Sequence, residues 1–428
     1  MPAFRFLSIG VACLFVAAFA RADNWERFRG PNGTGVSQDK NIPTTFSAKE
    51  GVLWKIPVAA GNSSPIVYGD KLFLHTTTDD GTQRAIVCYD TANGAELWKK
   101  TLPGKKVAIR HDSSMASSTP TTDGEHVFVS FWTGKEIILK AFNFKGDEVW
   151  SRNLGEFISQ HGPGASPILY KDKVLLANDM DSHYDIKTLA KAVANPSTLY
   201  ALDKKTGNTV WEARREPYRA CYSAPFVIER PGKATELIIT STTAITSYDP
   251  DSGKPNWNWK WSFSSMPLRT VASTAFVNDT LLACSGDGGG DRHMVAVAMN
   301  GIGKDARPDQ LWENKKDFPY VTCMLTRGDH VYFVNDAGLA GCCKVKTGEK
   351  VWFARLPDAK FYASPVMING NIYACSDQGD VFVIAADPGS FQQIAKNALG
   401  ERVRATPAVA NGRLYIRGQN NLYCIGTK

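Results

Sequence analysis

The stretch that decides the fold is Ala201-Leu-Asp-Lys-Lys-Thr-Gly-Asn-Thr-Val-Trp211, a small residue followed by a glycine turn and a tryptophan. Close copies run from Cys88 to Trp98 and from Cys342 to Trp352. Including looser and truncated copies, seven tryptophans close such a motif: Trp54, Trp98, Trp150, Trp211, Trp257, Trp312 and Trp352. Repeats of this length made of short alternating strands are typical of β-propellers, because each unit is one small sheet that cannot bury its own faces.

A second motif marks the start of each unit: a small residue, often Ser or Thr, then usually Pro and an apolar run. Asn-Gly and Gly-Asp pairs that follow the starts indicate hairpins, so each unit is expected to be four antiparallel strands. The starts are Ser64-Pro65, Thr119-Pro120, Ser166-Pro167, Ala224-Pro225, Ser364-Pro365 and Thr406-Pro407, with Thr274-Ala275 and Met324-Leu325 in the two remaining places.

Eight starts are followed by only seven outer strands in phase, six closed by a motif tryptophan and the seventh at residues 391–394, and the last unit ends after three strands. Residues 51–57 form a further strand with no preceding partner. We therefore predict an all-β, eight-bladed propeller of four-stranded antiparallel blades, closed by the N-terminal strand, which completes the last blade and removes an exposed sheet edge. Residues 391–394 are the expected outer strand of the seventh blade. A seven-blade ring is the alternative, and it would leave one start without a blade.

The first 22 residues have the features of a signal peptide. Arg5 precedes an apolar run from Phe6 to Phe19, and Ala20-Arg21-Ala22 supplies a small-x-small cleavage site. The run is too short to span a bilayer, so we expect no transmembrane segment. These features predict a periplasmic or secreted protein, with a signal peptide at 1–22, a leader segment at 23–46 and the propeller at 47–428.

The charge of the chain excludes one class of partner. The formal net charge is +7 at pH 7, and removal of the signal peptide with its two arginines lowers it to +5. Nucleic-acid binding needs a concentrated basic stripe, which this sequence lacks. No nucleophile elbow, zinc-protease motif or phosphate-binding loop is present either.

The tryptophans and most of the cysteines are expected to serve packing. A tryptophan in an outer strand can cover the gap between two blades and bury roughly 150–250 Å². The place of Cys88 and Cys342 in the motif is held by Ala201 in another copy, so it is a position for a small buried residue. Cys342 and Cys343 are consecutive residues of one strand and point to opposite faces, which argues against a bridge between them.

The repeat resembles that of the pyrroloquinoline-quinone (PQQ) propeller superfamily, over residues 51–428. The leader Trp25-Glu-Arg-Phe-Arg-Gly-Pro-Asn-Gly-Thr-Gly35 resembles a segment that precedes such propellers in exported bacterial proteins. The resemblance implies either a quinoprotein dehydrogenase, with PQQ and Ca²⁺, or a non-enzymatic member such as the propeller subunit of the outer-membrane β-barrel assembly machinery. The long insertions and recognisable Ca²⁺ ligands of the dehydrogenases are missing here, which favours the non-enzymatic branch.

One end of the ring is the expected functional face. The loops that lead into the first strand of several blades carry basic side chains that are expected to converge on the central funnel, where guanidinium groups can hold an anion. The alternative is a solvated rim with internal ion pairs. The candidate ligand-binding residues are Arg110, His111, His161, Arg219, Arg269 and Arg404.

Two acidic loops are candidate metal sites. Asp179 and Asp181 stand in an alternating series of oxygen ligands that lacks the glycine and glutamate of an EF-hand. Asp287 and Asp291 flank a run of glycines. We expect a monomeric binding or scaffolding module rather than an enzyme, whose partner is a protein or a small anionic ligand in the cell envelope. The alternative is a PQQ-dependent or degenerate quinoprotein oxidoreductase.

Overall fold

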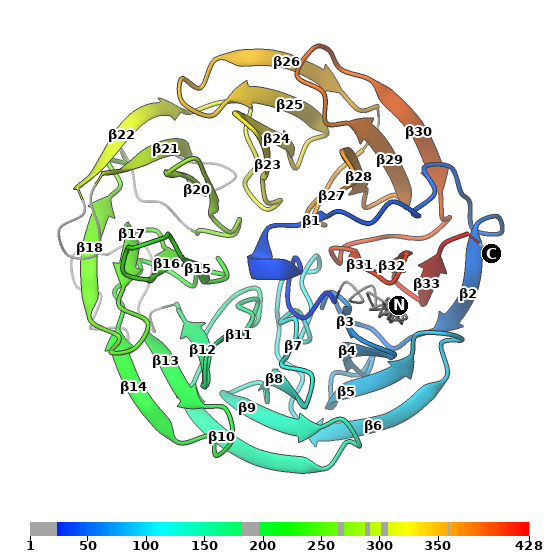
Figure 1. The fold of residues 1–428 in the computed structure, drawn as a ribbon. Helices are drawn as coiled ribbons and strands as arrows, with labels where there is room; N and C mark the ends of the chain where they lie inside the picture. Colours follow the sequence, from blue (N-terminus) through cyan, green and yellow to red (C-terminus); the bar gives the residue numbers. More distant parts are fainter. Residues whose placement is uncertain are drawn as a thin grey trace, which may run out of the picture.

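Eight blades, each of four antiparallel strands, are arranged around a common axis in the computed structural model of the chain (Figure 1), and residues 36–37 add a short parallel strand to the sheet of the seventh blade. The structure describes residues 24–181, 197–263, 269–286, 292–300, 307–357 and 359–427. Within these ranges, one 3-10 turn, η1 (Pro31–Gly33), is the only helical element. The prediction of an all-β, eight-bladed propeller is confirmed, and a ring of seven blades is excluded.

The first four blades follow one another along the chain, and each runs from the axis outward. They are composed of β3 (Ile66–Tyr68), β4 (Lys71–Thr77), β5 (Gln83–Asp90) and β6 (Glu96–Pro103); β7 (Thr121–Thr122), β8 (His126–Trp132), β9 (Glu136–Asn143) and β10 (Glu148–Glu156); β11 (Ile168–Tyr170), β12 (Lys173–Asn178), β13 (Thr198–Asp203) and β14 (Thr209–Arg214); and β15 (Phe226–Ile228), β16 (Glu236–Thr240), β17 (Ala244–Tyr248) and β18 (Pro255–Lys260).

The last four blades repeat this order, and in the eighth the outer strand comes from the N-terminal side of the chain. They are composed of β19 (Ala275–Val277), β20 (Thr280–Ser285), β21 (His293–Asn300) and β22 (Arg307–Asn314); β23 (Leu325–Arg327), β24 (His330–Val334), β25 (Leu339–Lys344) and β26 (Lys350–Arg355); β27 (Val366–Ile368), β28 (Asn371–Cys375), β29 (Asp380–Ala385) and β30 (Gln393–Ala398); and β31 (Ala408–Ala410), β32 (Arg413–Arg417), β33 (Asn421–Ile425) and β2 (Val52–Pro57).

The eighth blade closes the ring as predicted. Strand β2 pairs antiparallel with β33, with Trp54 opposite Cys424 and Ile56 opposite Leu422. In the seventh blade the predicted outer strand at 391–394 is wrong in its position, because β30 begins at Gln393. Phe391 instead lies edge-on against the ring of Trp352, with 5.5 Å between the ring centroids, so it covers the interface with the sixth blade.

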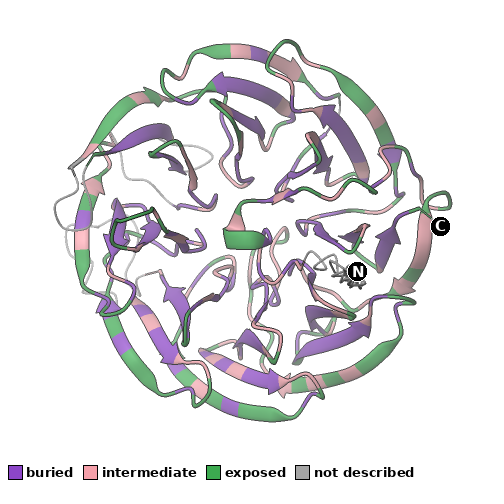
Figure 2. Ribbon diagram, in the orientation of Figure 1, coloured by how far each residue is buried: buried purple, intermediate pink, exposed green. Residues whose placement is uncertain are grey.

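The burial pattern follows the place of each strand in its blade. Middle strands lie between two neighbouring blades and are apolar on both faces; β12 and β20 are buried along their whole length. Outer strands face solvent with every second residue, as in β6. Figure 2 shows the result as a buried inner ring inside a mostly exposed rim.

Six of the seven motif tryptophans tie one blade to the next. Each donates its indole N–H to a main-chain carbonyl of the following blade, as Trp150 does to Lys204 at 2.9 Å. In five of the six, all but Trp352, the ring also lies over the turn glycine of that blade: a Cβ atom added to Gly207 would be 2.6 Å from Cδ2 of Trp150. The exception is Trp257, whose indole donates at 2.8 Å to the carboxylate of Glu236 in its own blade. The turn glycine is therefore required for close approach as well as for its positive φ.

Replacing Gly207 with alanine is expected to lower the free energy of unfolding by about 2–4 kcal/mol, because a methyl group at φ +70° would also collide with Trp150. Gly232→Ala is the matched control, since Gly232 has a φ of +69° and a methyl group added there would meet no atom within 4 Å. It should cost only about 1 kcal/mol. Urea unfolding measures both, and equal losses would contradict the role of the tryptophan contact.

The cysteines occupy packing positions. Each of the eight cysteines in the described part of the chain is a buried free thiol. Burial raises the pKa of Cys342 to about 11 and that of Cys343 to about 12. Cys342 lies opposite Tyr332 on one side and Trp352 on the other, within the blade core. The two neighbours are therefore separate thiols, each packed in the interior of the propeller.

The leader crosses the ring at one end of its axis. Trp25 forms a β-bridge with Val67 of the first blade, and Glu26 accepts main-chain and side-chain hydrogen bonds from the second. Arg27 donates to the carbonyl of Pro225 in front of the fourth blade. Strand β1 (Val36–Ser37) then pairs in parallel with β27 of the seventh blade. In Figure 1 the segment passes through the centre of the ring, with η1 in the middle.

Arg29 fixes the leader across the axis. Its guanidinium group donates to the carbonyls of Met324 (2.7 Å) and Pro365 (3.2 Å), which precede the innermost strands of the sixth and seventh blades. It also donates to the carbonyls of Gly33 (3.1 Å) and Thr34 (2.9 Å) of the leader itself. The side chain is almost fully buried, and this burial lowers its pKa. Four main-chain acceptors thus replace the water that solvates an exposed guanidinium.

Candidate functional site

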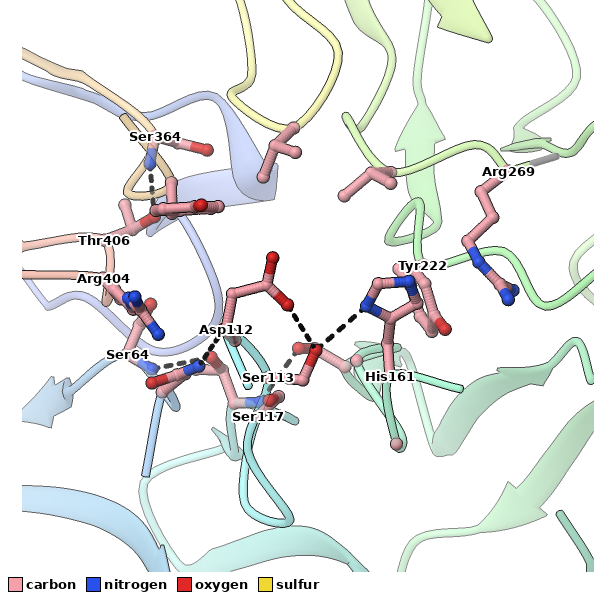
Figure 3. A pocket seen from close by; sticks show the side chains of 18 of the residues that line it. Ser64, Asp112, Ser113, Ser117, His161, Tyr222, Arg269, Ser364, Arg404 and Thr406 are labelled. Atoms are coloured by element: carbon pink, nitrogen blue, oxygen red, sulfur yellow. Dashed lines mark hydrogen bonds between the residues drawn. The ribbon is translucent and has the colours of Figure 1, made fainter. Parts of the chain in front are cut away.

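A cavity of about 550 Å³ lies on the axis of the ring, next to the leader segment that crosses it. Phe28 of the leader lines it. Every blade contributes to its wall through the segment that leads into its innermost strand (Figure 3). The volume lies within the range of roughly 300–1,000 Å³ that is usual for small-molecule pockets.

The wall follows a simple register in the sequence. The small residue of the unit start is Ser273 in the fifth blade and Cys323 in the sixth, one residue before the predicted place. With this register, the residue two positions before the small residue lines the cavity in all eight blades: Asn62, Ser117, Gly164, Tyr222, Val271, Val321, Tyr362 and Arg404. Because the eight segments are related by the rotation of the blades, equivalent positions face the same axis. This register is the sequence signal that finds the pocket, and it identifies Tyr222 and Tyr362, which our candidate set missed.

The small residues of the unit starts link neighbouring blades at the base of the pocket. The backbone N–H of Ser64 donates to the hydroxyl of Thr119, and that of Thr119 donates to Ser166, both at 3.0 Å. Equivalent bonds run from Ala224 to Ser273, from Ser273 to the sulfur of Cys323, from Cys323 to Ser364 and from Ser364 to Thr406. These hydrogen bonds show that two predicted starts were placed one residue too late. Ser273 and Cys323 hold the small-residue position, so Thr274 and Met324 stand where the other six blades have proline. Because these two starts have no proline, the sequence did not indicate which residue of the start is the small one.

Three predicted arginines line the cavity, and each is paired with a carboxylate. Arg110 lies 3.3 Å from Asp112, Arg269 lies 2.8 Å from Asp181 and Arg404 lies 2.7 Å from Asp377. Burial raises the pKa of Asp112 and of Asp181, but the bonds from their arginines outweigh it and hold both pKa values below the ordinary one. The hydrogen bond to Asp377 raises the pKa of Arg404. These three arginines therefore form internal ion pairs, as in the alternative interpretation of the rim.

His161 is part of a polar chain on the wall. Its Nδ1 atom is 2.9 Å from the hydroxyl of Ser113, which is 3.4 Å from Oδ1 of Asp112 (Figure 3). Burial lowers the pKa of His161 to about 4, so the imidazole is neutral at pH 7. The serine lies between the histidine and the carboxylate, whereas a histidine that activates a serine lies between the hydroxyl and the acid. The arrangement holds the histidine in place and does not generate a nucleophile.

The other candidates in the described residues do not line the cavity. His111 is exposed and lies between Arg110 and Asp112, which do line it. Arg219 is buried, and its charge lowers the pKa of Asp181. Asp179 is buried in an ion pair with Arg215, with 2.6 Å between Oδ1 and Nε. Asp181 is bound to Arg269. Two metal candidates, Asp287 and Asp291, lie outside the described residues.

The fold and the site define a β-propeller with a ligand-sized axial pocket, blocked at one end by its own leader. A model of the family described as outer membrane protein assembly factor BamB matches residues 38–188 and 182–354, and the chain belongs to this family. No curated protein matches the chain in sequence. Among the described residues, no helix is long and apolar enough to cross a membrane.

Solved structures share the architecture at low identity. BamB from Moraxella catarrhalis is 17% identical, with a TM-score of 0.62 over 87% of this chain and 96% of that one. Quinohemoprotein alcohol dehydrogenase from Comamonas testosteroni is 12% identical, with a TM-score of 0.60 over 96% of this chain and 82% of that one. Sqt1 from Saccharomyces cerevisiae is 10% identical, with a TM-score of 0.59 over 91% and 99%. These likenesses show the fold alone.

Proposed function

We propose that the protein is an exported, monomeric propeller that acts as a binding or scaffolding module in the periplasm or cell envelope, and that it receives a protein partner on the face around the axial pocket. The observation that carries the proposal is the family match over residues 38–354, to a family described as an outer-membrane protein assembly factor. The pocket face supports it, because segments of all eight blades meet there. A surface assembled from many loops on a rigid scaffold is a common place for recognition.

The oxidoreductase alternative finds less support in the residues. Ca²⁺, which accompanies PQQ in the dehydrogenases, takes six to eight oxygen ligands, largely carboxylates. In the described part of the chain, no group of three or more His, Cys, Asp or Glu is placed to hold a metal. The carboxylates beside the pocket, Asp112, Asp181 and Asp377, are each bound to an arginine instead. These residues do not fit a PQQ–Ca²⁺ site.

Site-specific photocrosslinking in cells tests the scaffolding role. A benzophenone amino acid at the exposed position His111, beside the pocket, should give a discrete adduct with one envelope protein. The same group at Val149, exposed on outer strand β10, is the control and should give none, because it lies on the circumference of the ring. No adduct at position 111, or the same adducts at both positions, would overturn the proposal.

A further inference from the structure

The side chains of the axial pocket point to one chemical class of small ligand. The three guanidinium groups of its wall, Arg110, Arg269 and Arg404, are matched by three directly bonded carboxylates, and His161 is neutral at pH 7. A polyanion would find its attraction to the arginines largely offset by the neighbouring acids, because both charges act over similar distances. This balance of positive and negative side chains favours an uncharged ligand with many hydrogen-bonding groups.

The base of the pocket supplies hydroxyl donors. The hydroxyl oxygens of Thr119, Ser166, Ser364 and Thr406 each accept a backbone N–H from a neighbouring blade, at 3.0 Å. The described structure gives none of these four hydroxyl groups an acceptor for its own hydrogen. Since a hydroxyl has one donor and two acceptor sites, each can still donate to an oxygen in the cavity. All four residues line it.

The wall also carries flat aromatic rings among these polar groups. Tyr222 and Tyr362 hold the same register position in the fourth and seventh blades, and Tyr320 adds a third ring from the sixth. The guanidinium group of Arg404 covers one face of the Tyr362 ring, 5.0 Å from its centroid. That of Arg292 covers one face of Tyr320 at 4.7 Å, so the other face or the edge of each of these two rings is what a ligand would meet. A sugar ring has a face of C–H groups that packs on an aromatic ring and an edge of vicinal hydroxyl groups that each donate and accept. An arginine–aspartate pair offers adjacent donors and acceptors to such an edge.

We infer that the axial pocket binds a neutral saccharide of about two sugar rings, with Tyr222 and Tyr362 as the packing surfaces and the arginine–carboxylate pairs and base hydroxyls as hydrogen-bonding partners. The pocket volume of about 550 Å³ is large enough for a ligand of this size. This site lies below the face assigned to a protein partner, and it does not require that partner.

Calorimetric titration of the purified protein tests the inference. The probes are neutral disaccharides, namely maltose, cellobiose, lactose, sucrose and N,N′-diacetylchitobiose, with citrate and inorganic phosphate as anionic probes. At least one sugar should bind, and Tyr362→Ala should weaken its binding about tenfold, which corresponds to the loss of one aromatic contact. Tyr218→Ala is the matched control, because Tyr218 is exposed and does not line the pocket.

A second variant keeps the test valid if Tyr362→Ala misfolds. Ser117→Trp adds a large ring from a half-buried position on the wall, so it should block sugar binding while the far-ultraviolet circular dichroism stays that of the wild type. Three results would overturn the inference: no binding of any sugar, binding of citrate or phosphate alone, or sugar binding that both pocket variants leave unchanged. Failure of these titrations is distinct from failure of the crosslinking experiment, since the latter detects a protein on the rim.

Discussion

Arg29→Ala is expected to lower the free energy of unfolding by about 3–5 kcal/mol, one of the two largest effects we anticipate. The substitution leaves the carbonyls of Gly33, Thr34, Met324 and Pro365 without their donor, and an unsatisfied buried polar group costs about 1–3 kcal/mol. It also opens a void beneath Gly35, where the guanidinium packs so closely that an added methyl group would lie 2.6 Å from its Nη2 atom. Denaturant unfolding followed by tryptophan fluorescence measures the change.

Two further variants separate charge from geometry at this position. Arg29→Lys keeps a positive charge but has no planar fork, so it should lose most of the same stability. Arg214→Ala removes an arginine whose side chain is 59% exposed, and it should change the free energy of unfolding by less than about 0.5 kcal/mol. A loss below about 1 kcal/mol for Arg29→Ala would show that the leader is not held by this side chain.

The second large effect is a loss of stability in acid that depends on His75. This side chain is fully buried, its Nδ1 atom is 3.1 Å from the carbonyl of Ser118, and burial lowers its pKa to about 3. The unfolded chain takes up a proton near the ordinary pKa of 6.5, whereas the folded protein does not until about pH 3. The free energy of unfolding therefore falls as the pH drops through this window, by about 2–3 kcal/mol between pH 7 and pH 4.5 from this group alone.

His75→Asn isolates this contribution. The asparagine amide can still donate to Ser118 but does not titrate, so the variant should lose less stability than the wild type between pH 7 and pH 4.5. His111→Asn removes an exposed imidazole and serves as the control. Parallel pH profiles for the wild type and His75→Asn, measured by urea unfolding at each pH, would contradict the assignment.

The architecture could be predicted from the sequence because the signals are local and repeated. The glycine turn before Trp211 and the Ser-Pro start at Ser64 each act within a few residues, and the eight unit starts fix the number of blades. The closure of the ring could also be predicted, because the last unit lacked an outer strand and β2 was a strand without a blade; the two pair through β33. The predicted unit starts were one residue too late in the fifth and sixth blades, because Ser273 and Cys323 are not followed by a proline.

The pocket could be predicted only in part because its chemistry depends on distant residues. Convergence of Arg110, Arg269 and Arg404 follows from the blade register, but the partner of Arg269 is Asp181, 88 residues away in another blade. No pattern in the sequence reveals such a pair. The path of the leader is equally non-local, because Arg29 reaches the carbonyl of Met324, 295 residues further along the chain, and that of Pro365, 336 residues further.

The pairing of β2 with β33 has a consequence for how the protein matures. Val52 lies opposite Ile425, so the contact that completes the eighth blade joins residues from the two ends of the described chain. During synthesis from the N-terminus, the edge of β2 stays unpaired until the C-terminal strand β33 has been made. Contacts of such high sequence separation form slowly, and unpaired edges promote aggregation. The finished ring is thus assembled only after the whole chain is available, and the interval before closure is when this protein is most exposed to chaperones and proteases.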